Sequence, residues 1–184
     1  MFRYSVVARV LFGSGVLLFA GPVGAEEGGL YGLGRLATET EINAWNIDVT
    51  PNGAGLPPGR GTVQQGAVIF VNKCALCHGP SGTEGPKDRL VGGHGSLATS
   101  QPVKTIGSYW PYATTLYDYI FRAMPFTAPQ SLTSDEVYSL VAWLLHQNRI
   151  ISNVAVMDAW TLPAVRMPNH DGFISDSRPD VPIR

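Results

Sequence analysis

Cys74-Ala75-Leu76-Cys77-His78 carries the strongest functional signal in this sequence. It contains both cysteines of the chain, with two residues between them, and a histidine follows the second directly. Two thiols at this spacing can form thioether bonds with the two vinyl groups of one haem, which holds the adjacent imidazole against one face of the iron. The motif therefore predicts one covalently bound haem c, attached through Cys74 and Cys77, with His78 as an axial iron ligand.

Three other interpretations of the cysteine pair compete with this one. A thioredoxin-like redox pair would stand in a βαβ pattern, and none surrounds it. Half of a zinc site would need further ligands, but His94, His146 and His170 show no ligand spacing among themselves. A disulfide across so short a loop would stabilise almost nothing. An export signal, a glycine-rich loop and a later Met-Pro pair, all described below, favour the haem interpretation.

The composition suits a small domain with much irregular backbone. The 184 residues are enough for one ordinary domain, and 45% of them are apolar, which excludes a disordered protein. Only 15% are charged, too few for the solvated helices of a coiled coil. The net charge of −1 excludes a general nucleic-acid binder. The 21 glycines and 14 prolines predict long irregular segments.

Residues 1–25 are predicted to form a secretory signal peptide. Two arginines precede an apolar run, Val10 to Ala20, that is short for a membrane span, and Val23-Gly24-Ala25 offers small residues to a signal peptidase. An uncleaved membrane anchor is the alternative. Cleavage after Ala25 would remove 25 of the 184 residues and two of the 13 basic ones, which changes the net charge from −1 to −3. The predicted location is the periplasm.

Two irregular flanks are predicted on either side of a central domain over residues 62–149. The N-terminal extension, residues 26–61, is expected to contain a short helix that begins at Thr38, whose spacing to Glu41 is that of a capping box. The C-terminal tail, residues 150–184, has four prolines and little periodicity, so it is expected to lie extended over the domain. Both flanks are expected to wrap a partner.

Capping and periodicity predict the helices of the central domain. Thr62 with Gln65 and Thr133 with Glu136 form capping boxes, which start the first and third helices. A second helix is predicted over 111–123 and is ended by the proline that soon follows. The third helix has an apolar stripe of Val137, Leu140, Val141, Leu144 and Leu145. The predicted fold class is all-α, with about three main helices around the haem.

The segment 79–107 contains seven glycines and no clear period, so it is predicted to be a long functional loop. Leu90 and Leu97 are expected to close the haem pocket, because a dry pocket disfavours the more charged ferric state. His94 is expected at the surface or the haem edge rather than on the iron. Solvated surface positions are expected for three basic residues that could otherwise pair with haem propionates: Arg89, Lys104 and Arg122.

A second axial ligand is expected from a methionine. Met124 is favoured, because it ends the second predicted helix and Pro125 presents it in a rigid turn before the third. Met167 also precedes a proline and is the rival, but no predicted helix follows it. Met157 is expected to pack in the core.

Around these residues the chain resembles a class I cytochrome c. In that family, the helix before the first haem cysteine crosses a C-terminal helix. The contact is made by a small residue eight positions before that cysteine and by an aromatic residue four positions before it. In this chain these residues are Gly66 and Phe70. The resemblance implies that Leu140 and Trp143 are their partners. It also implies that Gly85-Pro86 is the turn whose carbonyl accepts the ring N–H of the haem histidine, an ordinary turn being the alternative.

A narrower resemblance, to the haem subunit of bacterial sulfur dehydrogenase (the SoxD type), covers most of the mature chain. It rests on the strings Gly32-Leu33-Gly34-Arg35, Ile47-Asp48-Val49, Gly55-Leu56-Pro57-Pro58-Gly59, Gly107-Ser108-Tyr109-Trp110-Pro111-Tyr112-Ala113, Ala123-Met124-Pro125-Phe126-Thr127-Ala128-Pro129-Gln130, Thr161-Leu162-Pro163 and Val165-Arg166-Met167-Pro168. In that family the subunit pairs with a molybdenum-cofactor subunit that oxidises sulfane sulfur on a carrier protein. The resemblance makes Tyr109, Trp110 and Tyr112 candidates for the haem rim, with packing between helices as the alternative.

The resemblance implies a periplasmic, non-catalytic haem subunit of a molybdenum-dependent dehydrogenase, which passes single electrons to another cytochrome. This chain has one C-x-x-C-H motif, whereas some members carry a second haem domain, so its onward electron route stays open. The substrate, carrier-bound sulfane sulfur or sulfite, stays open as well. The alternatives are a diffusible electron carrier and a haem enzyme or sensor with an open iron position.

Overall fold

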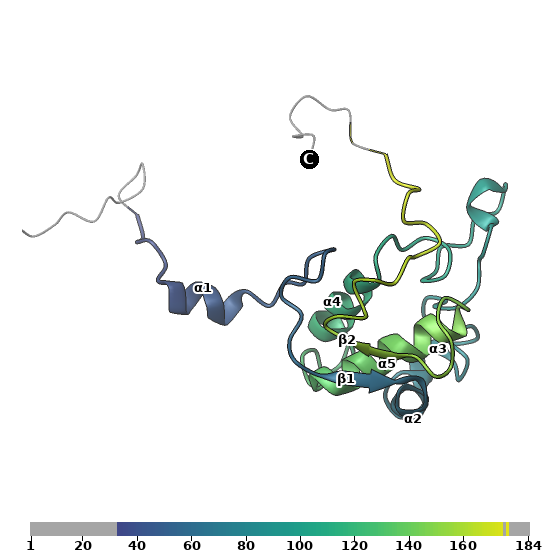
Figure 1. Ribbon diagram of the computed structural model, residues 1–184, viewed down its shortest axis with the longest axis horizontal. Helices are drawn as coiled ribbons and strands as arrows, with labels where there is room; N and C mark the ends of the chain where they lie inside the picture. Colours follow the sequence, from purple (N-terminus) through teal and green to yellow (C-terminus); the bar gives the residue numbers. More distant parts are fainter. Residues whose placement is uncertain (1–32, 175, 177–184) are drawn as a thin grey trace, which may run out of the picture. The chain divides into compact units, whose positions relative to one another are not determined.

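The computed structural model describes residues 33–174 and 176, so the predicted signal peptide lies outside the described residues. The elements, shown in Figure 1, are α1 (Glu39–Trp45), β1 (Arg60–Thr62), α2 (Val63–Lys73), α3 (Ala75–His78), a 3-10 helix (Ser96–Ala98), α4 (Ala113–Ala123), α5 (Ser134–Gln147) and β2 (Val156–Asp158). The chain divides after Ile42, and every element after α1 belongs to the unit that begins at Asn43. No helix among the described residues is long and apolar enough to cross a membrane.

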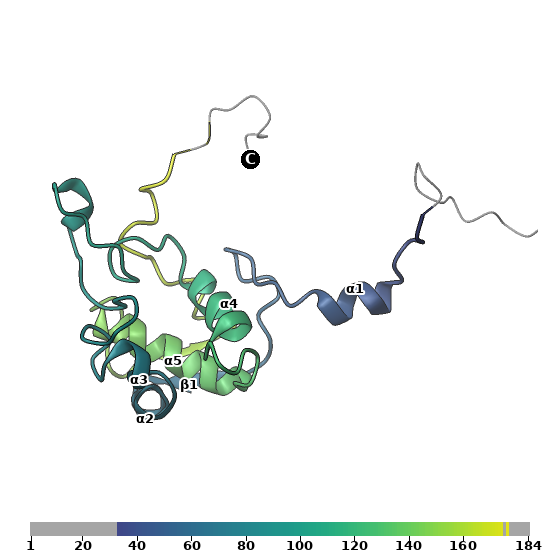
Figure 2. The same ribbon diagram turned by 180° about the vertical axis from the view of Figure 1, so that it is seen from behind.

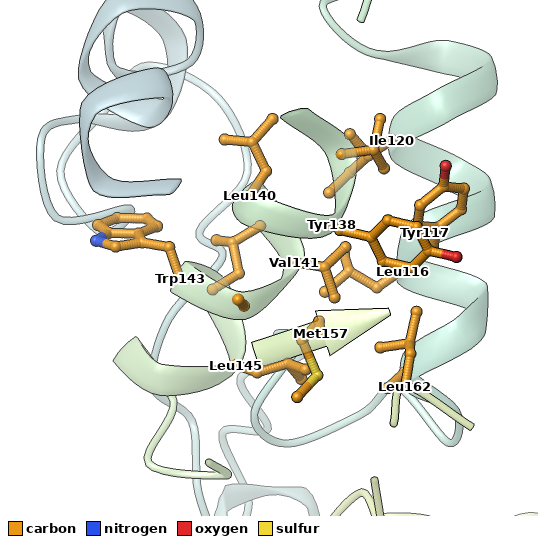
Figure 3. Packing of buried hydrophobic residues seen from close by; sticks show 14 of the residues in the cluster. Leu116, Tyr117, Ile120, Tyr138, Leu140, Val141, Trp143, Leu145, Met157 and Leu162 are labelled. Atoms are coloured by element: carbon orange, nitrogen blue, oxygen red, sulfur yellow. The ribbon is translucent and has the colours of Figure 1, made fainter. Parts of the chain in front are cut away.

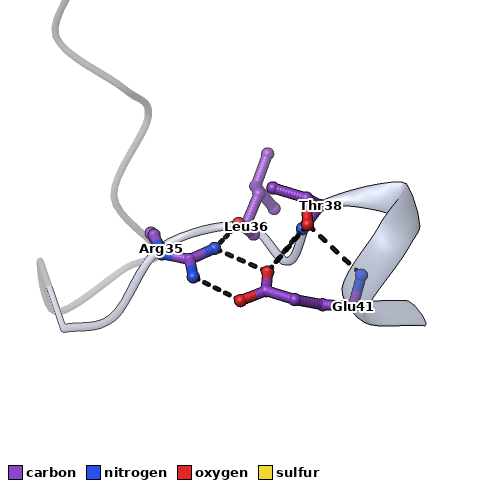
Figure 4. A network of polar contacts seen from close by, with 4 residues as sticks. All are labelled: Arg35, Leu36, Thr38 and Glu41. Atoms are coloured by element: carbon purple, nitrogen blue, oxygen red, sulfur yellow. Dashed lines mark hydrogen bonds and ion pairs between the residues drawn. The ribbon is translucent and has the colours of Figure 1, made fainter. Parts of the chain in front are cut away.

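The short helix α1 begins at the predicted capping box. Thr38 Oγ1 accepts a hydrogen bond from the Glu41 N–H (3.3 Å), and the Glu41 carboxylate accepts one from the Thr38 N–H (2.9 Å). Arg35 donates to both oxygens of the same carboxylate, at 2.9 and 2.6 Å, as Figure 4 shows. The guanidinium lowers the pKa of Glu41 to about 2, so this exposed carboxylate is ionised at neutral pH.

The two other predicted capping boxes are also confirmed. Thr62 accepts from the Gln65 N–H at the start of α2, and the Gln65 side chain accepts from the Thr62 N–H in return. Thr133 and Glu136 make the same reciprocal pair at the start of α5. α4 begins at Ala113, two residues later than predicted, because Tyr112 keeps an extended backbone.

α2 and α5 cross in close contact at Gly66. A Cβ atom there would lie 1.9 Å from the carbonyl oxygen of Ser139, so a larger residue would force the helices apart. One turn further along α2, the ring of Phe70 stacks on Trp143, with 4.0 Å between the ring centroids. The expected pairing of Gly66 and Phe70 with Trp143 of the last helix is therefore confirmed, and Ser139 is an additional partner. The expected contact with Leu140 stays a prediction.

The hydrophobic core surrounds α5, which runs between α2 and α4 in both views (Figures 1 and 2). Figure 3 shows Trp143 on one side of α5 and Tyr138 on the side of Tyr117 from α4. Tyr117 and Tyr138 are completely buried, and their ring centroids are 4.6 Å apart. Because helices contribute most of this core, the predicted all-α class is confirmed.

A small antiparallel ladder, which the sequence did not predict, joins the two flanks. β1 pairs with β2 in the register Arg60 to Asp158, Gly61 to Met157 and Thr62 to Val156. Beyond β2, Leu162 and Met167 are buried in the same core as the helices. The described part of the C-terminal tail thus contributes to the hydrophobic core of the domain.

Part of the N-terminal flank packs against the same helices. The N–H of Val49 donates to the buried Asp118 carboxylate of α4 at 2.9 Å. Further along, the Tyr138 hydroxyl of α5 donates to the carbonyl of Pro57 at 2.9 Å. These contacts hold the irregular segment between Val49 and Pro57 along α4 and α5.

Candidate haem site

The cysteine-histidine motif lies where α2 ends and α3 begins. The Cys74 N–H donates to the Phe70 carbonyl at 2.9 Å, and the Cys74 carbonyl accepts from the N–H groups of Cys77 and His78, each at 3.1 Å. Both thiols are free; Cys74 is half-buried and Cys77 is exposed. Burial raises the pKa of the Cys74 thiol to about 11, so the thiol is neutral at neutral pH.

One hydrogen bond orients the ring of His78. Its Nδ1 lies 2.8 Å from the backbone carbonyl oxygen of Asp88. Since a carbonyl can only accept, Nδ1 carries the proton and Nε2 keeps its lone pair for a metal. The expected acceptor was the turn at Gly85-Pro86; the structure instead has Asp88, two residues beyond Pro86.

Gly85 has a different role from the one expected of its turn. A Cβ atom at this position would lie 2.1 Å from the Cys77 carbonyl oxygen and 2.4 Å from the His78 carbonyl carbon. The same Cys77 carbonyl accepts the N–H of Lys87 at 2.9 Å. The turn therefore packs directly on the backbone of the motif, and the chain after it reaches His78 through Asp88.

These residues fit a covalently bound haem c. Two unpaired thiols stand three positions apart at a helix junction, and the neighbouring imidazole has Nδ1 occupied and Nε2 free. Covalent attachment needs free thiols, and iron ligation needs a neutral imidazole of this tautomer.

The three methionines that follow the predicted signal peptide lie in different environments. Met124 caps the C-terminus of α4, with its N–H donating to the Ile120 carbonyl at 3.0 Å, and its side chain is half-buried at the edge of the core. Met157 and Met167 are 4% and 2% exposed within the core. This difference in burial favours Met124 as a ligand and core packing for the other two.

The three aromatic candidates for the haem rim point to different neighbours. Tyr109 packs edge-on against Phe173, with 5.3 Å between centroids, and the Lys104 amine lies 4.9 Å from the Tyr109 ring. Trp110 packs edge-on against Tyr119 of α4 at 5.8 Å.

Tyr112 lies against the C-terminal tail. Its ring packs edge-on against His170 at 5.3 Å, and its backbone bridges to Arg166. With these two residues it lines a cavity of about 470 Å³ to which none of Cys74, Cys77 and His78 contributes. A rim role for the three aromatic residues stays a prediction.

The remaining predicted residues lie on or near the glycine-rich loop. Leu90 is half-buried against the core, and its N–H donates to Gly82 at 2.8 Å. Leu97 is half-buried in the 3-10 helix, and Arg89 is exposed. Arg122 forms ion pairs with Asp48 (3.1 Å) and with Asp118.

Asn148, which the sequence analysis missed, ties this loop to the end of α5. Its side chain is 1% exposed, and its Oδ1 accepts the N–H of Gly92 at 3.0 Å. Its Nδ2 donates to the carbonyls of Leu90 (3.2 Å) and Leu144 (2.9 Å). The exposed His94 donates through Nε2 to the Asn148 carbonyl at 2.8 Å. The available signal was an asparagine directly after an apolar helix, where such residues often form caps.

Comparisons with known proteins identify the family of this chain. Residues 61–144 match the family model described as cytochrome C oxidase, cbb3-type, subunit III. The structure is similar to a chain of the sulfane dehydrogenase SoxCD from Paracoccus pantotrophus, with 44% sequence identity over 81% of this chain and 74% of that chain, and a TM-score of 0.74. No curated protein sequence matches the chain.

The helical fold and its attachment motif define a cytochrome c domain of class I. Domains of this class carry covalently bound haem c. More narrowly, the chain belongs to the SoxD-like haem c subunits.

Proposed function

We propose that this protein is the electron-accepting haem subunit of a periplasmic, molybdenum-dependent sulfur-compound dehydrogenase. The observation that carries the proposal is the 44% identity, over 81% of the chain, to a chain of the sulfane dehydrogenase SoxCD. Its substrate would be carrier-bound sulfane sulfur or sulfite, oxidised on the partner subunit, and another cytochrome would receive the electrons.

In this proposal, Cys74 and Cys77 would hold one haem through thioether bonds, and His78 and Met124 would ligate its iron. The haem, when bound, supplies a reversible one-electron change of its iron, at a relatively high potential with a Met/His pair. The Asp88 carbonyl keeps the His78 tautomer fixed and raises the basicity of Nε2. Asn148 holds Leu90 and its loop in place, which limits the access of water.

The two flanks would serve the partner interface. Their described parts already contribute to the domain through the β1–β2 ladder and the buried Leu162. Because these contacts fix the flanks on the domain, the solvent-facing surfaces of the flanks would form a rigid binding surface for the molybdenum-cofactor subunit. We place the domain boundaries at residues 26–61, 62–149 and 150–184, after a signal peptide over 1–25.

A reconstitution experiment tests this function. The purified haem-loaded chain is mixed with the molybdenum-cofactor subunit from the same organism, and the haem absorption is followed after addition of sulfite or of sulfane-loaded carrier protein. Haem reduction that depends on both subunit and substrate supports the proposal. If the chain runs as a free monomer in gel filtration and its haem is not reduced in the mixture, it is a diffusible carrier. If the reduced native chain binds carbon monoxide, it is a haem enzyme or sensor with an open iron position.

A further inference from the structure

A tryptophan projects into solvent from the C-terminal flank. Trp160 lies two residues after the end of β2, and its side chain is 88% exposed, whereas Trp143 in the core is 6% exposed. Tryptophan has one of the largest apolar surfaces of any side chain and is usually at least partly covered in a folded protein. The exposure of Trp160 therefore needs a physical reason.

The turn that carries Trp160 is held by a dense set of local hydrogen bonds. Asp158 Oδ1 accepts the N–H groups of Trp160 (2.9 Å) and Thr161 (2.8 Å). Thr161 Oγ1 accepts the Asp158 N–H (2.9 Å) and lies 2.9 Å from the Val156 carbonyl, to which it donates. These bonds use the backbone of Trp160 and leave its indole free.

Both sides of this turn are anchored to the domain. Before it, Asp158 pairs with Arg60 in the β1–β2 ladder. After it, the completely buried Leu162 donates its N–H to the Asp158 carbonyl at 3.0 Å. The projecting indole is thus held by a rigid support, so little conformational entropy is lost when a partner covers it.

We propose that Trp160 is an anchor residue for the molybdenum-cofactor subunit, which receives the indole in an apolar pocket with a hydrogen-bond acceptor at its rim for the indole N–H. The inference rests on the proposed function, because it takes its partner from there. Tryptophan is among the residues most enriched at the energetic centres of protein interfaces. The similar structure, that of SoxCD, is named for a complex of two proteins.

The local charge favours a protein partner over a lipid surface. Residues 150–165 contain one acidic residue, Asp158, and no lysine or arginine, and the exposed Arg60 of β1 lies opposite Asp158 and offsets its charge. The surroundings of the turn therefore carry no excess of positive charge. Segments that bind anionic membranes combine aromatic residues with basic ones. An apolar pocket on a protein therefore fits this isolated, rigidly held indole better than a lipid surface does.

The test compares dissociation constants for the complete haem-loaded chain and the immobilised molybdenum-cofactor subunit. Trp160→Ala is expected to raise the dissociation constant about 30-fold or more, the range of an interface anchor, and Trp160→Phe less. The control Val68→Ala removes part of an exposed apolar side chain from α2 and is expected to leave the constant within about twofold. Unchanged haem absorption and melting temperature show that each variant is folded.

The rigid support is tested separately at Asp158. Asp158→Ala removes the acceptor of the turn and is expected to weaken binding although the indole is intact. Asp158→Asn keeps an Oδ1 acceptor and is expected to restore most of the affinity. Equal binding by the alanine variant and the unmodified chain contradicts the role of the support.

The outcomes separate this inference from the proposed function. If the unmodified chain binds the subunit and Trp160→Ala binds equally well, the inference is wrong and the proposed function stands. If the unmodified chain does not bind, both fail. Fluorine NMR of 5-fluorotryptophan, assigned with Trp160→Phe, overturns the inference if Trp160 is already shielded from water in the isolated chain. The inference is also overturned if the unmodified chain binds phosphatidylglycerol vesicles and Trp160→Ala abolishes that binding without changing the binding to the subunit.

Discussion

At the scale of single residues, the candidate site depends on which atoms remain free. The His78 ring has its Nδ1 bonded to a backbone carbonyl, so Nε2 is available to iron. Among the methionines discussed, Met124 is half-buried, whereas Met157 and Met167 are enclosed by the core. Burial and hydrogen bonding together support the proposed ligands, His78 and Met124.

Met124→Ala is expected to open one axial position of the haem and to lower its potential, because the thioether ligand of a Met/His pair is lost. The measurements are the absorption spectrum, redox titration and carbon monoxide binding. Met167→Leu is the matched control: it conserves the volume of a buried side chain, so the spectrum is expected to stay unchanged at a cost below about 1.5 kcal/mol of unfolding free energy. An unchanged Met124→Ala spectrum would show that another residue ligates the iron.

Asn148→Ala is expected to lower the free energy of unfolding by about 1–3 kcal/mol, because it leaves partly buried polar groups of Leu90 and Gly92 without their partner. Chemical denaturation measures this loss. The haem potential is expected to fall as well, since a looser loop admits water. His94→Ala removes the contact that an exposed side chain makes to the Asn148 backbone, and is expected to cost no more than about 0.5 kcal/mol. An equal loss in both variants would contradict a specific role of the Asn148 side chain.

At the scale of elements, α2 and α5 are held together by packing and by one ion pair. The close approach at Gly66 and the stacking of Phe70 on Trp143 provide the packing. The Lys73 amine at the end of α2 lies 2.6 Å from Glu136 Oε1 in the first turn of α5. Glu136 also belongs to the α5 capping box, so one carboxylate links the start of α5 to the end of α2.

The pH dependence of stability is expected to reflect this ion pair. Its hydrogen bond with Lys73 lowers the pKa of Glu136. The stabilisation is therefore fully present above the ordinary carboxyl pKa of 4.5 and is lost as the pH falls through the lower folded-state value. Because both side chains are partly exposed, we expect about 0.3–1 kcal/mol. Glu136→Gln is expected to unfold more easily at pH 7 and to lose less stability between about pH 5 and pH 3.

Melting temperatures across this pH range measure the effect. Lys73→Met serves as the control, because it removes the ion pair and leaves the capping box. An identical pH profile for Glu136→Gln and the unmodified chain would show that the pair does not contribute.

At the scale of the whole domain, the C-terminal tail completes the core. Leu162 lies beyond the last helix and outside any predicted element, yet it is completely buried with residues of α4 and α5. Leu162→Ala is expected to lower the free energy of unfolding by about 2–5 kcal/mol, as for other buried leucines. Ile174→Ala, at a position 96% exposed, is expected to have almost no effect. Denaturation curves compare the two, and equal small losses would mean that the tail is dispensable for the core.

Local patterns were sufficient to predict α1, α2, α4 and α5, but not the short α3 or the 3-10 helix. The capping boxes at Thr38, Thr62 and Thr133 depend on residues three positions apart, and each forms as expected. The missed features join distant parts of the chain: β1 to β2, Asn148 to Gly92, and His78 to Asp88 across a loop. No local periodicity reports such pairs, because their geometry depends on how the loops close.

The sequence by itself determined the chemistry this protein can perform and the positions of its main helices. Thiol spacing and an adjacent imidazole are fixed by the covalent chain, and a capping box depends on residues only three positions apart, so all three can be recognised in the sequence. The tertiary structure alone decided that Asp88 orients His78, that Met167 lies in the core while Met124 lies at its edge, and that Trp160 projects from a rigid turn. Burial and long-range hydrogen bonds exist only after packing, and these distinguish residues that are alike in sequence.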